Sequence, residues 1–153
     1  NLYLLKKYSM PVLELEKEII DEFEMFDNWM EKYEHLIELG KDLPLISTKH
    51  KIENNLIKGC QSKVWLHADS NKNVVSFYAD SEAIITKGII ALLIRVLNNQ
   101  TPENILQAEL NFINEIGLTN HLSPTRANGL LEMVKQMKNY AYTLKIKNNL
   151  LKK

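Results

Sequence analysis

The sequence has little of several features that often mark a function. Its 153 residues include one cysteine, Cys60, so the chain can form no internal disulfide and cannot supply the four thiolates usual in structural zinc or iron–sulfur sites. Only five glycines occur, scattered along the chain, and no nucleotide-binding glycine loop is present. The 19 basic and 19 acidic residues cancel, so nucleic-acid or anionic-membrane binding is not expected. We therefore expect no cofactor or metal of its own and a reducing, cytoplasmic compartment.

The chain also lacks a long apolar run. No stretch approaches the roughly 20 residues of a membrane helix, and lysines interrupt residues 1–7 too soon for a secretory signal. With 45% hydrophobic and 25% charged residues, the composition is that of a globular protein with one domain. We expect this domain at 12–144, after an extension at 1–11 that is disordered or a start or tag artefact, and before a basic tail at 145–153.

Helical spacing dominates the first part of the chain. Apolar residues recur every three or four positions over 12–39, and Asp27 is a candidate cap for a second helix within this range. Gly40 is placed as a helix terminator, and residues 43–55 have the composition of a surface loop. Two helices followed by a polar connection are therefore predicted.

Three β-like runs follow, at 56–58, 64–69 and 74–79. The residues between the last two, 70–73, have turn composition and predict an antiparallel hairpin. We therefore predict an α+β fold in which a small antiparallel three-stranded sheet packs against helices.

Three further helices are expected. The first follows a cap at 80–82, ends near 98–99 and is apolar almost all round, as in a buried central helix. The second begins at the cap, proline and acid of 101–103 and ends at Gly117. The last begins at 123–124 and has one predicted apolar face, consisting of Leu130, Leu131, Met133, Val134 and Met137.

Cys60 is the candidate reactive residue. A thiol is nucleophilic only as its thiolate, and an unperturbed cysteine with a pKa near ~8.5 is only about 3% ionised at pH 7. Gly59 suits a tight loop tip, and Lys58 and Lys63 place positive charge near the sulfur, so exposure and charge both favour reactivity. The alternative is that Cys60 is a small buried hydrophobic residue.

Two other chemistries remain open at this point. A cysteine hydrolase would need a histidine beside Cys60, and the sequence cannot show which of its four histidines, His35, His50, His67 and His121, would serve. No cysteine-protease signature is present. A metal site built from His67, His121 and a carboxylate has even less support, because no two histidines have the spacing that places them on one helix face.

The segment from Asn55 to Leu66, NLIKGCQSKVWL, resembles the active-site segment of the SufE family, sulfur-acceptor proteins that work with cysteine desulfurases. Two later blocks, residues 79–93 and 117–130, resemble that family's later motifs in the right order, and residues 33–40 with Leu43-Pro44 agree as well. The match covers about 19–141. One departure is Glu82, where the family commonly has aspartate.

This resemblance implies a fold of the SufE and IscU type and a role for Cys60 as persulfide acceptor. A pyridoxal-phosphate desulfurase of the SufS or CsdA type would donate the sulfur, and a SufBCD-type scaffold would receive it for cluster assembly. The chain would be a carrier and co-substrate, not an enzyme, and a monomer or weak homodimer. In the family the cysteine loop can sit sheltered in an apolar pocket and swing out on docking. Residues assigned to partner binding or loop support are Gly59, Gln61, Ser62, Glu82, Lys87, His121 and Arg126.

Several of these residues have ordinary structural explanations. Arg126 could hold a neighbouring loop, His121 could pack at a helix entry, and Lys87 could be a solvated helix charge. A noncatalytic regulator that binds a desulfurase, and a CsdE-like carrier for another pathway, remain alternatives to cluster assembly.

Overall fold

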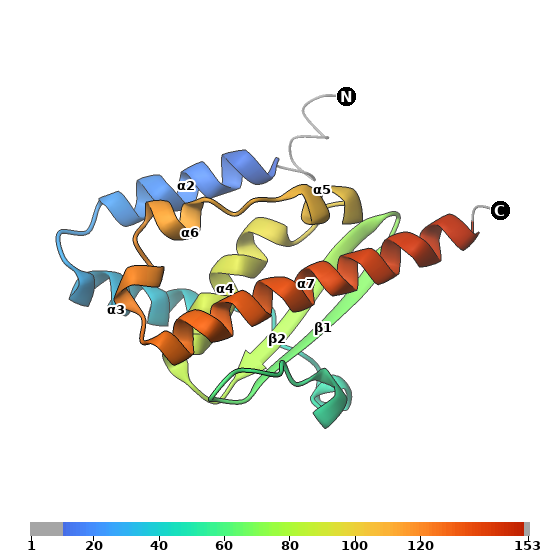
Figure 1. The fold of residues 1–153 in the computed structure, drawn as a ribbon, viewed down its shortest axis with the longest axis horizontal. Helices are drawn as coiled ribbons and strands as arrows, with labels where there is room; N and C mark the ends of the chain where they lie inside the picture. Colours follow the sequence, from blue (N-terminus) through green and yellow to red (C-terminus); the bar gives the residue numbers. More distant parts are fainter. Residues whose placement is uncertain (1–10, 152–153) are drawn as a thin grey trace.

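The computed structural model describes residues 11–151, in which a two-stranded antiparallel hairpin packs against a group of helices (Figure 1). Residues 1–10 and 152–153, which belong to the predicted N-terminal extension and basic tail, lie outside the described residues. Helices α4 (Ile84–Leu97) and α7 (Pro124–Leu151) contact the hairpin directly, and the other helices pack around these two. The predicted α+β class is confirmed.

The first two helices, α2 (Val12–Glu24) and α3 (Trp29–Lys41), confirm the predicted break within 12–39. The cap of α3 is Asn28, whose side chain accepts a hydrogen bond from the Glu31 amide at 3.0 Å. The prediction of Asp27 as the cap is therefore wrong by one residue. Gly40, the predicted terminator, lies inside the last turn of α3, which ends at Lys41. Its backbone is close to Gly88 of α4.

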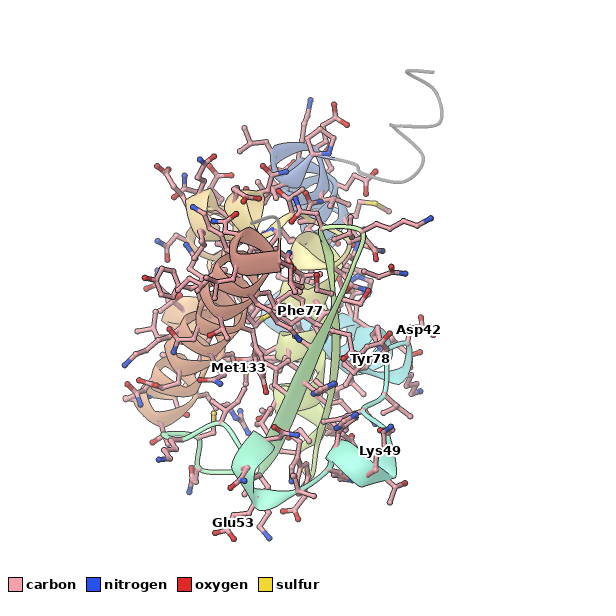
Figure 2. All side chains as sticks on the ribbon, turned by 90° about the vertical axis from the view of Figure 1, so that its right-hand side faces the viewer. Asp42, Lys49, Glu53, Phe77, Tyr78 and Met133 are labelled. Atoms are coloured by element: carbon pink, nitrogen blue, oxygen red, sulfur yellow. The ribbon has the colours of Figure 1, made fainter. Side chains whose placement is uncertain are left out.

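The hairpin consists of β1 (Val64–Asn71) and β2 (Val74–Ser81), joined by Lys72 and Asn73. Both turn residues have positive φ, 52° and 61°, which matches the two-residue turns that follow the twist of a hairpin. Side chains alternate along each strand, so Phe77 is buried while Tyr78 faces the opposite side (Figure 2). The predicted hairpin is confirmed.

The third strand, predicted at 56–58, does not form, and the sheet has two strands. After a 3₁₀ turn at Glu53–Asn55, Leu56 makes one isolated bridge to Trp65. The chain then reaches Gly59, whose φ of +88° turns it away from β1. A three-residue run between two turns is too short to continue the ladder.

The outer edge of β2 is nevertheless covered. Its outward amides find acceptors in two segments. Val75 donates to the Gln100 carbonyl and Phe77 to the Asn98 side chain, both just after α4, and Ala79 donates to the Pro44 carbonyl. The loop from Pro44 begins at this edge, where Leu45 bridges Ala79, and then passes to the edge of β1, where Leu56 bridges Trp65. Its two 3₁₀ turns, Thr48–His50 and Glu53–Asn55, lie between these contacts, and Figure 2 labels Lys49 and Glu53 within them. Such covering satisfies backbone groups that a third strand would otherwise pair.

Helix α4 is the buried centre of the fold, as predicted, with nine buried residues among its 14. The helix predicted over 101–117 is instead two short helices, α5 (Pro102–Gln107) and α6 (Phe112–Glu115). The chain leaves helical geometry at Ala108 because the intervening residues bury Ala108 and Leu110 in the core, with Leu110 at a φ of 58°. Thr101 caps α5 as predicted.

Helix α7 spans 28 residues and continues through the predicted basic tail as far as Leu151. Its buried side includes Leu130, Met133 and Met137, and Met133 lies in the interior beside the hairpin (Figure 2). Leu131, which was predicted on the same face, is 63% exposed. Consecutive helical residues differ by about 100° around the axis, so Leu130 and Leu131 cannot share one face.

Helices α3 and α4 cross at two glycines. A Cβ atom on Gly88 would lie 2.2 Å from the Leu36 carbonyl oxygen, and one on Gly40 would lie 3.1 Å from the Gly88 amide nitrogen. The first distance is impossible without moving one helix, whereas the second needs a shift of a few tenths of an ångström. The crossing therefore depends on Gly88 more than on Gly40.

We predict that Gly88→Ala lowers the free energy of unfolding by about 2 kcal/mol, because a backbone clash of about 3 kcal/mol exceeds the roughly 1 kcal/mol gained in helix propensity. Gly40→Ala, the matched control, should stay within about 1 kcal/mol of the wild type. Urea unfolding followed by circular dichroism measures both. A Gly88→Ala protein as stable as the wild type would contradict this description of the crossing.

Candidate functional site

Cys60 lies on a short loop, residues 58–63, that enters β1, and it is half-buried against α7. Its thiol donates a weak hydrogen bond to the Gly129 carbonyl oxygen, with Sγ 3.7 Å away. A Cβ on Gly129 would lie 3.3 Å from the same sulfur. Gly129 therefore lets the cysteine loop rest directly on the helix.

A small cavity of about 70 Å³ opens beside the thiol, between α4 and α7. Its volume exceeds the roughly 30 Å³ that one water occupies in the liquid. The lining residues, which come from three segments, are Cys60, Gln61, Ser62, Thr86, Ile89, Thr125, Arg126, Gly129 and Met133. Cys60 thus faces a partly apolar recess, the sheltered arrangement that the family resemblance implied.

Burial raises the pKa of the Cys60 thiol, and the negative charge of Glu132 raises this pKa further. Lys58 and Lys63 favoured reactivity from the sequence, but in this conformation the thiol is less reactive than they suggest, as is expected for a sheltered cysteine loop. The two lysines are close to Cys60 in sequence, but burial and Glu132, which is distant in sequence, set the direction of the pKa shift. In this position the thiol is protonated and a poor nucleophile at neutral pH.

Three predicted residues do gather around Cys60. Gln61 and Ser62 follow it in the loop and line the cavity, Gln61 being exposed and Ser62 half-buried. Arg126 lines the cavity from the first turns of α7, with an exposed side chain and an amide that donates to the Ser123 hydroxyl at 3.3 Å. The structure brings these residues to the thiol, although their roles there stay a prediction.

Gly59 has two constraints of its own. Its φ of +88° lies in the region that favours glycine, and a Cβ there would lie 2.9 Å from Cγ of Glu132. Its carbonyl oxygen accepts a hydrogen bond from the Asn128 side chain at 3.4 Å. Sequence reasoning missed Asn128 and Glu132 as contacts of the loop. The one available signal was Gly129, because a glycine inside a helix is unfavourable by about 1 kcal/mol and often marks a close approach.

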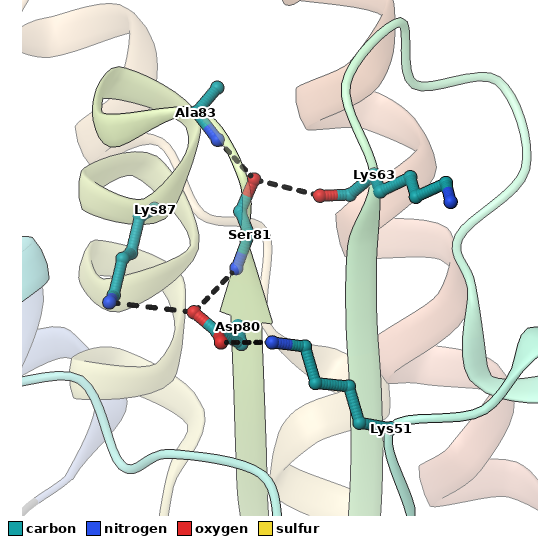
Figure 3. Close-up of polar contacts among 6 residues, drawn as sticks. All are labelled: Lys51, Lys63, Asp80, Ser81, Ala83 and Lys87. Atoms are coloured by element: carbon teal, nitrogen blue, oxygen red, sulfur yellow. Dashed lines mark hydrogen bonds and ion pairs between the residues drawn. The ribbon is translucent and has the colours of Figure 1, made fainter. Parts of the chain in front are cut away.

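The far end of the cysteine loop is fixed to the end of β2 (Figure 3). The Ser81 hydroxyl donates to the Lys63 carbonyl at 2.9 Å (Figure 3). The Glu82 amide donates to the same carbonyl at 3.2 Å. The Glu82 side chain is exposed at this corner and is not part of the cavity lining. Glu82 thus supports the loop through its backbone.

Lys87 forms an ion pair with Asp80, Nζ to Oδ1 3.4 Å, and Lys51 pairs with the other carboxylate oxygen at 2.8 Å (Figure 3). Burial acts to raise the pKa of Asp80, but hydrogen bonds from Lys51 and the Ser81 amide, with the charges of both lysines, hold that pKa below its usual range. Lys87 is therefore a partner of Asp80 at the start of α4 and does not line the cavity.

His121 lies at the entry to α7, away from the cavity lining. Its ring stacks on Trp29, with centroids 3.9 Å apart, and its Nδ1 is 2.9 Å from the Gly117 carbonyl oxygen. This arrangement supports the packing explanation. None of the four histidines, all within the described residues, lines the Cys60 cavity, so the site has no histidine base for a hydrolase.

Residues 11–151 contain no group of three or more histidine, cysteine, aspartate and glutamate side chains arranged to hold a metal ion. No helix within this range combines the length and the apolar character needed to cross a membrane.

Comparison with known proteins agrees with these features. A family model described as SufE, Fe-S metabolism associated domain, matches residues 17–141. An uncharacterized SufE-like protein of Rhizobium meliloti (strain 1021) is 36% identical over 129 residues, covering 81% of this chain and 92% of that protein. SufE-like protein 1, chloroplastic/mitochondrial, of Arabidopsis thaliana is 38% identical over 133 residues, covering 86% of this chain but 36% of that protein.

The fold also has a solved counterpart. The solution structure of a hypothetical protein from Thermus thermophilus superimposes with a TM-score of 0.71, covering 84% of this chain and 94% of that one. The two sequences are 21% identical, so this likeness establishes the fold alone.

We predict that native Cys60 reacts with iodoacetamide several-fold more slowly at pH 7.5 than the same thiol in urea, with a titration midpoint above the ordinary value near ~8.5. The reason is its raised pKa, so the native state keeps its proton to higher pH than the unfolded chain. This difference favours folding below the unfolded pKa and is lost as the pH rises through the native one. Mass spectrometry measures the alkylation, and Cys60→Ser is the unlabelled control. A native midpoint below ~8.5 would contradict the prediction.

Proposed function

Because this chain belongs to the SufE family, whose members are sulfur-transfer partners of cysteine desulfurases, we propose that it takes persulfide sulfur onto Cys60 and delivers it for iron–sulfur cluster assembly. The donor is a pyridoxal-phosphate desulfurase of the SufS or CsdA type, and the receiver is a SufBCD-type scaffold. The chain is a carrier and co-substrate that stimulates its partner, and the proposed compartment is the cytoplasm.

The observation that carries the proposal is the position of Cys60. The chain's only thiol lies on a short loop, beside a small cavity and within a segment covered by the family model. Gly59 gives the backbone beside it a conformation that other residues resist. A thiol on a loop supported by a hairpin and a helix can be presented to another protein, whereas one at a strand centre cannot.

The transfer balances without an added oxidant or reductant. The Cys60 thiolate attacks the outer sulfur of the desulfurase persulfide, a new S–S bond forms at Cys60, and the bond between the two donor sulfurs breaks. The desulfurase cysteine leaves as a thiolate and takes up a proton equivalent to the one that Cys60 lost. Cys60 then holds the sulfur as a persulfide until a second thiol or a scaffold group attacks it.

The resting geometry requires a movement before this step. Cys60 is half-buried, and burial raises the pKa of its thiol. A docked partner that draws the loop away from α7 would expose the thiol and would also remove the causes of its raised pKa. The pKa of the thiol therefore returns toward its ordinary value in the docked state.

We predict that mixing the protein with a cysteine desulfurase and L-cysteine, without reductant, adds one sulfur atom to the wild type and none to Cys60→Ser. Intact mass spectrometry reads the product, and a thiol reductant should reverse it. Circular dichroism of Cys60→Ser checks that the substitution leaves the fold intact.

The other outcomes separate the alternatives. No sulfur gain, together with stimulation of the desulfurase that survives Cys60→Ser, would establish a noncatalytic regulator instead. Hydrolysis of an ester or amide by the chain alone would establish a hydrolase. Transfer to a scaffold or to another acceptor, followed with radiolabelled sulfur, separates cluster assembly from a CsdE-like pathway.

A further inference from the structure

Two side chains one turn apart on α7 contact the cysteine loop from the same side. Asn128 donates to the Gly59 carbonyl oxygen at 3.4 Å. Glu132 lies over Gly59 so closely that a Cβ on this glycine would be 2.9 Å from its Cγ and 3.5 Å from its carboxyl carbon. Residues i and i+4 lie on one face of a helix, so both side chains meet the loop at the same residue.

A third contact from α7 fixes the sulfur itself. The Gly129 carbonyl accepts the weak hydrogen bond from Cys60, whose Sγ is 3.7 Å away. One turn of α7 therefore contacts the backbone of Gly59 and the side chain of Cys60 together. These contacts are 69 residues apart in sequence, so they form only when the helix and the loop are both in place.

The charged residues around Cys60 do not affect its pKa equally. Glu132 raises the pKa of the thiol in addition to the effect of burial. Arg126 lines the cavity from α7, Lys58 and Lys63 belong to the loop, and α4 contributes the uncharged Thr86 and Ile89 to the lining. The direction of the shift shows that the positive charges do not compensate for Glu132 and burial in this conformation.

We propose that Asn128 and Glu132 form a latch that holds the cysteine loop on α7, and that Glu132 is a positioning residue that suppresses the thiolate of Cys60 until a partner draws the loop away. The inference rests on the proposed role of Cys60 as sulfur acceptor. Withdrawal of the loop removes the thiol from Glu132 and from the recess in one movement. The thiolate fraction therefore rises in the docked complex, where the persulfide donor is present.

We predict that Glu132→Gln, which keeps the size of the side chain and removes its charge, moves the pH midpoint of Cys60 alkylation to lower pH. The rate at pH 7 should rise several-fold, up to about the tenfold that one pKa unit would give. Iodoacetamide labelling of the isolated protein, followed by mass spectrometry, gives the profile without any partner. The matched control is Glu24→Gln, because Glu24 is an exposed glutamate at the end of α2, which does not line the cavity.

A midpoint that is the same in Glu132→Gln as in the wild type would overturn the role of Glu132. An equal shift in Glu24→Gln would also overturn it, because the effect would then reflect net charge alone. Thermal unfolding of each variant must give the wild-type midpoint, so that faster labelling reports the loop and not global unfolding.

A second variant tests the latch without changing a charge. Asn128→Ala removes the hydrogen bond to Gly59 and should raise the labelling rate by a similar factor at every pH, because it increases opening of the loop. Unchanged labelling in Asn128→Ala would overturn its part in the latch.

The persulfide assay separates this inference from the function on which it rests. If Glu132→Gln and Asn128→Ala change the labelling profiles as predicted but no protein gains sulfur, the latch is supported and the carrier function is refuted. Sulfur gain by the wild type, with profiles identical in all variants, would support the carrier and refute the latch.

Discussion

The burial of α4 is the constraint on which the rest of the structure depends. Nine of its 14 residues are buried, and the hairpin, α3 and α7 each contact it. At about 25 cal/mol for each Å² of apolar surface removed from water, such a helix is a major part of the driving force for folding. It also contributes Thr86 and Ile89 to the cavity beside Cys60. The element that organises the core thus forms one wall of the candidate site.

Glycines occur where this arrangement needs backbones to touch. Gly88 lets α3 approach α4, and Gly129 lets the cysteine loop approach α7. Both lie inside helices, where glycine is unfavourable by about 1 kcal/mol compared with alanine. The first contact serves packing, whereas the second places a thiol against a helix and a glutamate. A helical glycine therefore supports stability in one place and a half-buried thiol in the other.

Regular periodicity made much of the fold predictable. The alternation in β1 and β2, the nearly all-apolar α4 and the Thr101 cap of α5 follow from local rules, and they appear in the structure as expected. Predictions failed where distant contacts decided the outcome. The buried residues Ala108 and Leu110 interrupt the helix expected over 101–117, because the core draws that segment inward.

The candidate site divides in the same way. The loop position of Cys60 could be predicted from the residues around it, and the sheltered position followed from the family resemblance. The contacts of Asn128 and Glu132 could not be predicted, because 69 or more residues separate them from Gly59. The apolar pattern of a helix predicts its buried face, but it does not show which loop packs against the polar residues of the other face. Lys58 and Lys63 misled for a related reason: they are neighbours of Cys60 in sequence, but burial and Glu132 decide the direction in which its pKa shifts.

The length of the cysteine loop limits how Cys60 can meet a partner. The loop is closed at its base, where the Ile57 amide donates to the Val64 carbonyl at 2.8 Å, and Lys63 is held by Ser81 and Glu82. Six residues, 58–63, span at most about 20 Å when extended, so the tip reaches no more than about 10 Å from the base. Cys60 near the middle can therefore leave its recess but cannot cross a wide gap. Under the proposed function, a donor whose persulfide lies in a cleft must admit the loop itself, and the contacts to α7 must break before the loop can enter.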